Sequence, residues 1–372
     1  MTARLRRQIV PTCAAALLTL AACGSGDQAA PTVSVAPSSS SSPASSSALS
    51  TTPPPSTTTR ASVAVTRTTK PPSPTTTKPR PAATDVLTGL KVSSGPMIAV
   101  KIDNTKAGLP HFGVSHADIV YVEQVEGGLT RLIVLFRSKL PDEVGPVRSV
   151  RSTDAELLSM YGSPGLAFSG GAGGPLERLA ATKIVDLSPD AAGDAYWRSD
   201  KASGTYNMHV NLAKLAADST QVTAPKTPGF QFAARDPRLA AAKAASRINV
   251  TMISGETGFS WTDGRYVVSR KGEPYADYDG AKVLADNVLV QNVVDEPDGT
   301  VDSVGSPSYL SHTVGSGTFT LFRSGKQIAG SWKRAAADQP TSYLDKSGKA
   351  VFFAPGRTWV VLAPQSASVT TA

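Results

Sequence analysis

The chain has 372 residues, of which 40% are hydrophobic and 18% charged, and its formal net charge at pH 7 is +8. Eight of the 37 Lys and Arg residues, but one of the 29 Asp and Glu residues, precede residue 85, which leaves 29 basic and 28 acidic side chains after it. This near-neutral remainder excludes a basic nucleic-acid-binding domain, so we expect no nucleic acid among the partners.

Residues 1–22 are typical of a bacterial lipoprotein signal peptide. Basic residues precede an apolar stretch from about Ile9 to Ala22, which is too short to span a bilayer as a mature helix. Leu20-Ala21-Ala22 stands directly before Cys23, so we expect cleavage there and acylation of the Cys23 thiol, palmitate included. Two or three acyl chains would anchor the protein at the extracytoplasmic face of the cell membrane. Ordinary secretion with an incidental cysteine is the alternative.

The cysteine count excludes further classes of site. The chain has two cysteines, and Cys13 lies inside the predicted signal peptide. The mature protein therefore has no thiol besides Cys23, which excludes disulfides, a cysteine nucleophile, thiolate zinc sites and iron–sulfur clusters.

Residues 23–84 are predicted to be a disordered tether. They are rich in Ser, Thr, Pro and Ala and contain almost no large apolar side chains, so they cannot bury enough surface to fold. The Ser/Thr-Pro density would also suit glycosylation. Their basic residues favour contact with an anionic wall polymer or lipid head groups.

Residues 85–220 read as a mixed α/β domain. Strands are predicted over 97–102, 119–125, 129–136 and 165–168, and the third is apolar enough to be buried on both faces. Thr153 and Glu156 form a capping-box pattern before a helix, and a second helix is predicted to open at Pro175. This alternation predicts at least some parallel pairing.

Residues 221–249 read as a proline-broken connector with a short helix over 239–246. Residues 250–364 are predicted to form a β-rich, mainly antiparallel domain, with hairpin turns at Asp263-Gly264, Ser324-Gly325 and Ser347-Gly348. Its predicted strands include 265–269, 288–294, 319–322 and 351–353, with a final strand over 358–362. The expected fold class is therefore α+β, with the mixed α/β domain followed by the β-rich one.

Polar side chains interrupt the first apolar strands. Asp103 ends one strand, Glu123 shares a face with Tyr121 by period-two alternation, and Glu126 falls on the other face or at the turn before Arg131. No cofactor is evident, although these carboxylates could ligate a divalent cation or act as an acid/base pair. The alternative is a structural ion-pair network at a sheet edge.

Two neighbouring elements favour an anion. Arg148 and Arg151 precede a predicted helix start, and Ser169, Gly170 and Gly171 begin a glycine-rich turn through which backbone can approach a ligand. The turn lacks the Gly-Lys-Ser/Thr ending of a nucleotide-binding loop and, alone, could be only a tight connection.

A nucleophilic triad of Ser169, His209 and Asp103 or Asp154 is disfavoured, because no Gly-x-Ser-x-Gly pattern surrounds Ser169. The sequence therefore assigns no catalytic residue.

An ordered series of motifs carries a family resemblance. The series consists of Ala99–Asn104, Ala117–Tyr121, Glu126–Arg131, Val144–Ser149 with Arg151, Asn287–Gln291, Gly330–Lys333 and Pro355–Trp359. Over residues 86–364 the chain resembles the YerB-like lipoprotein family, a domain of unknown function with a C-terminal partner domain. The resemblance implies a membrane-anchored extracytoplasmic lipoprotein and assigns no reaction.

The sequence thus favours binding of an anionic cell-envelope component, a wall polymer or glycan, by Asp103, Glu123, Glu126, Arg131, Arg148 and Arg151. An envelope enzyme acting on a phosphorylated or glycan substrate and a protein-interaction scaffold remain alternatives.

Overall fold

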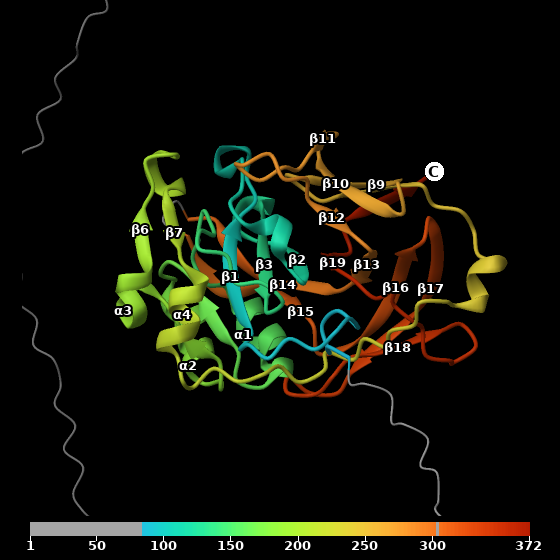
Figure 1. Cartoon of the computed structure of the whole chain (residues 1–372), viewed down its shortest axis with the longest axis horizontal. Coiled ribbons are helices and arrows are strands. Elements are labelled where there is room, and N and C mark those ends of the chain that lie inside the picture. Colours follow the sequence, from blue (N-terminus) through green and yellow to red (C-terminus); the bar gives the residue numbers. More distant parts are fainter. Residues whose placement is uncertain (1–83, 303–304) are drawn as a thin grey trace, which may run out of the picture. The chain divides into compact units, whose positions relative to one another are not determined.

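The computed structural model describes residues 84–302 and 305–372. Its largest element is a ten-stranded mixed sheet (Figure 1). Its strands, in spatial order, are β18 (Ser342–Asp345), β17 (Lys326–Arg334), β16 (Gly315–Arg323), β13 (Asn287–Asn292), β19 (Thr358–Ala363), β2 (Ile119–Gln124), β3 (Thr130–Phe136), β1 (Ile98–Asp103), β4 (Gly165–Ala167) and β5 (Val185–Asp186). The predicted signal peptide, Cys23 and all but the last residue of the predicted tether lie outside the described residues.

Strands from both halves of the sequence meet at the middle of this sheet. β19 pairs in parallel with β2, so that Thr358 lies opposite Ile119, and β13 pairs in parallel with the other edge of β19. The described residues belong to one compact unit. Whether the predicted domains 85–220 and 250–364 fold independently stays a prediction, but neither completes this sheet alone.

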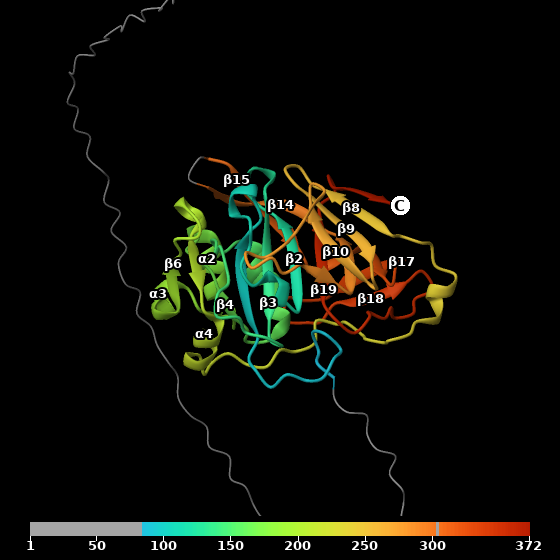
Figure 2. The same cartoon turned by 45° about the horizontal axis from the view of Figure 1, so that its top comes forward.

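A six-stranded sheet covers one face of the first (Figure 2). It consists of β11 (Glu273–Pro274), β10 (Arg265–Arg270), β9 (Glu256–Thr262), β8 (Arg247–Thr251) and β20 (Ser368–Thr371), with β12 (Leu284–Ala285) paired to β10. Ile248, Phe259 and Val268 of this sheet pack in one core with Val100 and Val122 of the larger sheet. Two smaller antiparallel pairs complete the strands: β14 (Val294–Val301) with β15 (Pro307–His312), and β6 (Tyr196–Arg198) with β7 (Met208–Val210).

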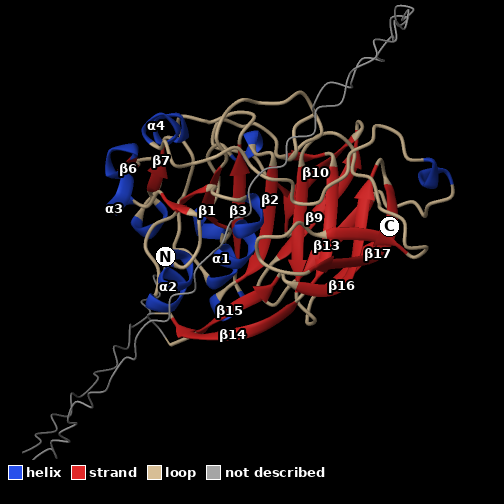
Figure 3. Ribbon diagram, turned by 90° about the horizontal axis from the view of Figure 1, so that it is seen from below, coloured by secondary structure: helices blue, strands red, loops and turns tan. Residues whose placement is uncertain are grey.

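Short helices pack against both faces. The α-helices are α1 (Ser152–Leu158), α2 (Gly173–Ala180), α3 (Pro189–Ala192) and α4 (Leu212–Asp218). Leu157 of α1 and Leu179 of α2 pack on the face opposite the six-stranded sheet, and the β14–β15 hairpin contacts these same two helices (Figure 3). Among the described residues, no helix is long and apolar enough to cross a membrane.

The strongest sequence signals are confirmed. β1, β2, β3, β4 and β19 lie where strands were predicted, and every residue of β3 is buried. β1 pairs in parallel with β4, as the strand–helix alternation indicated. Asp263 and Gly264 both have positive φ, at 52° and 81°, as a two-residue hairpin turn requires.

Three local predictions are wrong. The alanine-rich segment forms only a 3-10 turn over Pro237–Ala240, because its end is drawn into extended pairing, with Ala245 donating its backbone N–H to Gly325 at 2.9 Å. Residues 351–353 form no strand, and Phe353 makes an isolated bridge with Phe232 instead. Residues 358–362 lie in β19 but are not the last strand, because β20 follows.

The predicted capping box of Thr153 and Glu156 is also wrong. The N-cap of α1 is Arg151, two residues before Thr153, and Asp154 Oδ2 accepts the backbone N–H of Arg151 at 2.6 Å. Thr153 Oγ1 accepts from the backbone of Ser311 at 3.0 Å, and Glu156 accepts from the backbone of Thr313. Both side chains therefore accept hydrogen bonds from the backbone in and just after β15 instead of capping α1.

The shared sheet predicts a single cooperative unfolding unit. Leu362 of β19 is fully buried, and Leu362→Ala should lower the free energy of unfolding by about 2–5 kcal/mol through the cavity it leaves. Denaturant-dependent hydrogen exchange, measured by mass spectrometry, gives the free energy of opening for each peptide. This free energy should fall equally in peptides from β1–β3 and from β13.

Leu90→Ala is the matched control, because Leu90 is half exposed and its truncation should change stability by no more than about 0.5 kcal/mol. Loss of protection confined to the peptides after residue 250 would show that the halves unfold separately.

Candidate functional site

The polar residues at the ends of β1, β2 and β3 lie in one row. Across the ladders, Asp103 pairs with Arg131, and Arg131 pairs with Glu123. Glu123 shares the core face of Tyr121, and Glu126 lies in a 3-10 turn over Glu126–Gly128, the second of the two placements considered from alternation. These strands therefore present acidic and basic groups together beside α1 and the β14–β15 hairpin.

Glu123 of this row also belongs to a fully buried ion triad. Lys101 of β1 donates to Glu123 of β2 and, at 2.8 Å, to Asp154 Oδ1 of α1, and all three side chains are inaccessible to solvent. Burial raises the pKa of Glu123 above its ordinary value, and the charge of Lys101 opposes that rise. The triad ties α1 to the sheet.

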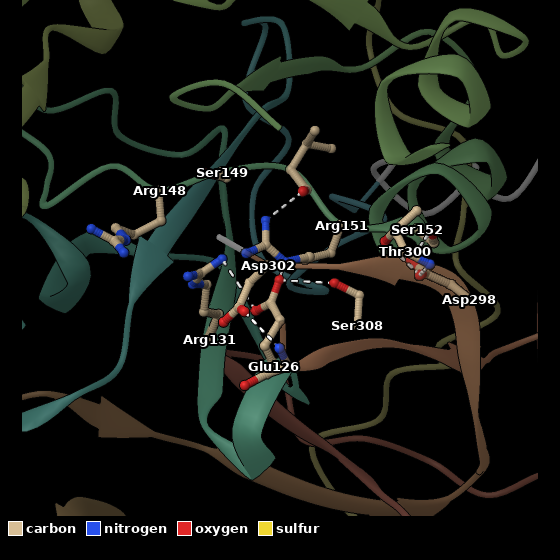
Figure 4. Close-up of polar contacts among 12 residues, drawn as sticks. Glu126, Arg131, Arg148, Ser149, Arg151, Ser152, Asp298, Thr300, Asp302 and Ser308 are labelled. Atoms are coloured by element: carbon tan, nitrogen blue, oxygen red, sulfur yellow. Dashed lines mark hydrogen bonds and ion pairs between the residues drawn. The ribbon is translucent and has the colours of Figure 1, made fainter. Parts of the chain in front are cut away.

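Glu126 organises two arginines. Arg151 forms an ion pair with Glu126 Oε1, Arg131 Nη1 lies 3.9 Å from Glu126 Oε2, and Ser308 Oγ donates to Glu126 Oε1 at 2.9 Å. Burial opposes ionisation, but the two guanidinium groups hold the pKa of Glu126 below its usual range. Figure 4 shows Arg131, Arg151 and Ser308 gathered around Glu126, with Arg148 to one side.

Arg148 is held by different partners. Its Nε lies 3.3 Å from Asp103 Oδ2, its Nη1 donates to the carbonyl of Thr205 at 2.9 Å, and its guanidinium lies over the Tyr206 ring. Asp103 also accepts from the backbone and hydroxyl of Thr105, at 2.6 Å each. Asp103 is therefore a positioning group for Arg148.

The glycine-rich turn runs beside the arginine segment. Ser169 donates its backbone N–H to the carbonyl of Arg148 at 2.9 Å, and Val150 donates to the carbonyl of Gly170 at 3.0 Å. Gly170 has a φ of +72°, and a Cβ on Gly171 would lie 2.6 Å from Val150 Cγ1. Glycine is thus favoured at position 170 by its positive φ and at position 171 by the close approach of the arginine segment.

The β14–β15 hairpin brings the other half of the sequence to the site. Asp298 accepts from Ser152 Oγ at 2.7 Å, and Ser308 binds Glu126 as described above. Val301 and Asp302 lie beside the same arginines. The sequence did not identify these residues, because no local pattern indicates that a hairpin about 150 residues away packs here.

Together these groups line a pocket of about 450 Å³, which we call the arginine pocket. Its lining consists of Glu126, Leu129, Arg131, Arg148, Ser149, Arg151, Gly171, Ala172, Pro175, Val301, Asp302 and Ser308. Of the residues predicted from the sequence, Glu126, Arg131, Arg148, Arg151 and Gly171 line it. Asp103 orients Arg148, Glu123 lies in the buried triad, and Ser169 and Gly170 support the wall through their backbone.

The arginines of the pocket repel one another as well as pairing with carboxylates. Burial, with the charges of Arg151 and Arg148, lowers the pKa of Arg131 to about 10 although Glu126 opposes this. Three guanidinium nitrogens face carboxylates: Arg148 Nε faces Asp103, and Arg131 Nη1 and Arg151 Nε face Glu126. Three guanidinium groups in one lining still offer many further N–H donors, so the pocket is suited to a group that accepts several hydrogen bonds and carries negative charge.

Other chemistries receive less support from the geometry. Across residues 84–302 and 305–372, no three His, Cys, Asp or Glu side chains gather to hold a metal ion. His209 Nδ1 binds Glu143 Oε1 at 2.7 Å, whereas Asp103 and Asp154 bind Arg148 and Lys101. The disfavoured triad with Ser169 is therefore not formed.

Comparison with known proteins finds two family models and a relative that match the chain. A family model described as "Protein of unknown function (DUF3048) N-terminal domain" matches residues 87–225, and the corresponding C-terminal model matches residues 247–360. The chain is 28% identical over 294 residues to a Bacillus subtilis (strain 168) protein named "Putative lipoprotein YerB", covering 75% of this chain and 85% of that protein.

The fold is also similar to a solved structure. The crystal structure of the YerB protein from Bacillus subtilis superposes with a TM-score of 0.65 at 22% identity, covering 78% of this chain and all of that one.

The buried triad predicts a large and pH-dependent effect of removing its cation. Lys101→Met leaves two buried carboxylates without a counter-charge and should cost about 3–5 kcal/mol in the free energy of unfolding. The charge of Lys101 opposes the rise that burial causes in the pKa of Glu123, so its removal raises that pKa further above the unfolded value of 4.5, and the variant loses stability relative to the wild type as pH rises beyond 4.5. Denaturant unfolding should therefore show a larger loss at pH 8 than at pH 5.

Adding Glu123→Gln to Lys101→Met should recover part of the loss, and Lys91→Met, at an exposed lysine, should have little effect. A Lys101→Met protein as stable as the wild type at pH 8 would refute the role of the triad.

Proposed function

We propose that this chain, which belongs to the DUF3048 family, binds an anionic group of a cell-envelope component in the arginine pocket. The observation that carries the proposal is the gathering of three guanidinium groups, from Arg131, Arg148 and Arg151, in the lining of one pocket. A phosphate or carboxylate supplies several acceptors and negative charge, and the planar guanidinium fork matches the geometry of both groups.

The carboxylates of the pocket support this role. Glu126 and Asp103 hold Arg151 and Arg148 in place through ion pairs, so the guanidinium groups are already oriented before a ligand arrives. Preorganised donors lose less conformational entropy on binding than free side chains do. The acidic groups are therefore orienting residues, and the arginines are the binding residues.

The proposed location follows from the N-terminal sequence and the relative. Leu20-Ala21-Ala22-Cys23 has the pattern of a lipoprotein signal, and the Bacillus subtilis relative bears a lipoprotein name. We propose that lipid on Cys23 anchors the protein at the extracytoplasmic face, from which the Ser/Thr/Pro-rich segment 23–84 allows the pocket to reach an anionic wall polymer or glycan.

Exchanging an arginine of the pocket for lysine tests the binding. Lysine keeps the charge but lacks the bidentate fork, so Arg148→Lys and Arg151→Lys should each weaken binding of inorganic phosphate and glycerol 3-phosphate about tenfold or more. Isothermal titration of the mature chain from residue 23, kept soluble by Cys23→Ser, measures this.

Arg247→Lys, at an exposed arginine of β8, is the matched control and should bind as the wild type does. If the wild type binds neither probe, or if the pocket variants merely melt earlier with unchanged affinity, the arginines are structural. Hydrolysis of a phosphorylated fragment by the wild type alone would favour an enzyme.

The anchor has its own test. Cys23→Ala removes the thiol that would be acylated, so the protein should move from the membrane fraction to the soluble or secreted fraction of expressing cells. Cys13→Ala, ten residues earlier in the predicted signal peptide, should leave the membrane fraction unchanged. An unchanged membrane fraction for Cys23→Ala would contradict lipid anchoring at this residue.

A further inference from the structure

The arginine pocket has an apolar side that anion binding alone does not explain. Two large aliphatic residues of its lining are strongly exposed: Leu129 at 40% and Val301 at 58%. Single exposed aliphatic residues are common on protein surfaces, but a group of them at a pocket marks a binding surface. A small inorganic or sugar phosphate held by the arginines would leave both in water.

Rigid backbone contacts hold this apolar side. Leu129 follows the 3-10 turn that carries Glu126, and it donates its backbone N–H to the carbonyl of Glu126 at 3.1 Å while its own carbonyl accepts from Val125 at 2.7 Å. Val301 ends β14, where it pairs with Pro307 of β15. One turn and one hairpin thus each contribute an aliphatic side chain to the lining of the pocket.

A third aliphatic residue extends the surface beyond the pocket. Ile253, 66% exposed, lies in the turn between β8 and β9 and is so close to Gly128 that a Cβ there would be 2.5 Å from Ile253 Cγ2. Ser254 fixes this turn by donating its backbone N–H to the carbonyl of Gly128 at 3.1 Å. We call Leu129, Val301 and Ile253 the aliphatic rim.

Cationic and apolar surfaces side by side are complementary to one kind of ligand. We propose that the pocket binds an amphiphilic phosphate, that is, a phosphate ester bearing a hydrocarbon chain; this rests on the proposed anion binding. The phosphate binds Arg131, Arg148 and Arg151, and the hydrocarbon chain lies across the aliphatic rim. The chain covers surface that is otherwise exposed to water, and the phosphate accepts hydrogen bonds from the guanidinium groups that line the pocket.

Two probes with the same head group separate the parts of this proposal. Glycerol 3-phosphate carries the phosphate alone, and dihexanoyl phosphatidate, used below its micelle-forming concentration, adds two short acyl chains. Each buried methylene strengthens binding about fourfold, so burying two of them makes phosphatidate bind more than about tenfold tighter to the mature chain with Cys23→Ser. Isothermal titration gives both dissociation constants and therefore their ratio.

Variants of the rim show where the chain binds. Leu129→Asn and Val301→Thr should each lower the ratio several-fold, because the chain then meets a polar surface. Val369→Thr in β20 is the matched control, since Val369 is also exposed, at 41%, but lies outside the pocket, and it should keep the wild-type ratio.

The outcomes distinguish this inference from the proposed function. Equal affinities for the two probes would overturn the amphiphile while leaving anion binding in place. A preference for phosphatidate that neither rim variant lowers would also overturn it, because the chain would then bind elsewhere. Failure of both probes to bind would remove the proposed function and, with it, this inference.

Discussion

The ion triad of Lys101, Glu123 and Asp154 is the constraint on which the rest of the site depends. A lysine buried in the middle strands of a sheet is tolerated only with its charge compensated, and here one carboxylate comes from β2 and the other from α1. Asp154 also accepts the backbone N–H of Arg151, so the residue that neutralises Lys101 also fixes the first turn of α1. Through these contacts, the ion triad inside the sheet fixes the start of α1 and, with it, the position of the arginine segment that leads into α1.

The hairpin of β14 and β15 supplies the second half of the arrangement. It reaches α1 through Ser152, Thr153 and Glu156 and reaches Glu126 through Ser308. The pocket is therefore not a property of residues 85–220 alone. It exists because β19 joins β2 and brings the segment after residue 250 against the same sheet. Binding and the assembly of the two halves are coupled in this fold, and substitutions in the sheet can be expected to affect both.

Local patterns were sufficient for the parts of the fold that local forces decide. The apolar runs of β1, β2 and β3 and the Asp263-Gly264 turn were predictable because alternation and positive φ leave direct marks in a sequence. The capping-box prediction was wrong because Thr153 and Glu156 bind residues about 157 positions away. Ser308 and Val301 were not predicted because the surface on which a hairpin packs is decided by long-range contacts. Lys101 lies within the Ala99–Asn104 motif but was not predicted as a site residue, since burial of a lysine cannot be inferred from its sequence neighbours.

The central claim is that the three arginines together receive one anion, and diffraction from crystals soaked in tungstate tests it most directly. Tungstate is a tetrahedral dianion of phosphate-like shape, and its tungsten atom is located without ambiguity by anomalous scattering. The account predicts an anomalous peak inside the arginine pocket, with tungstate oxygens within hydrogen-bond distance of Arg131, Arg148 and Arg151. Tungstate bound elsewhere on the molecule, with no peak in the pocket at the same concentration, would contradict it.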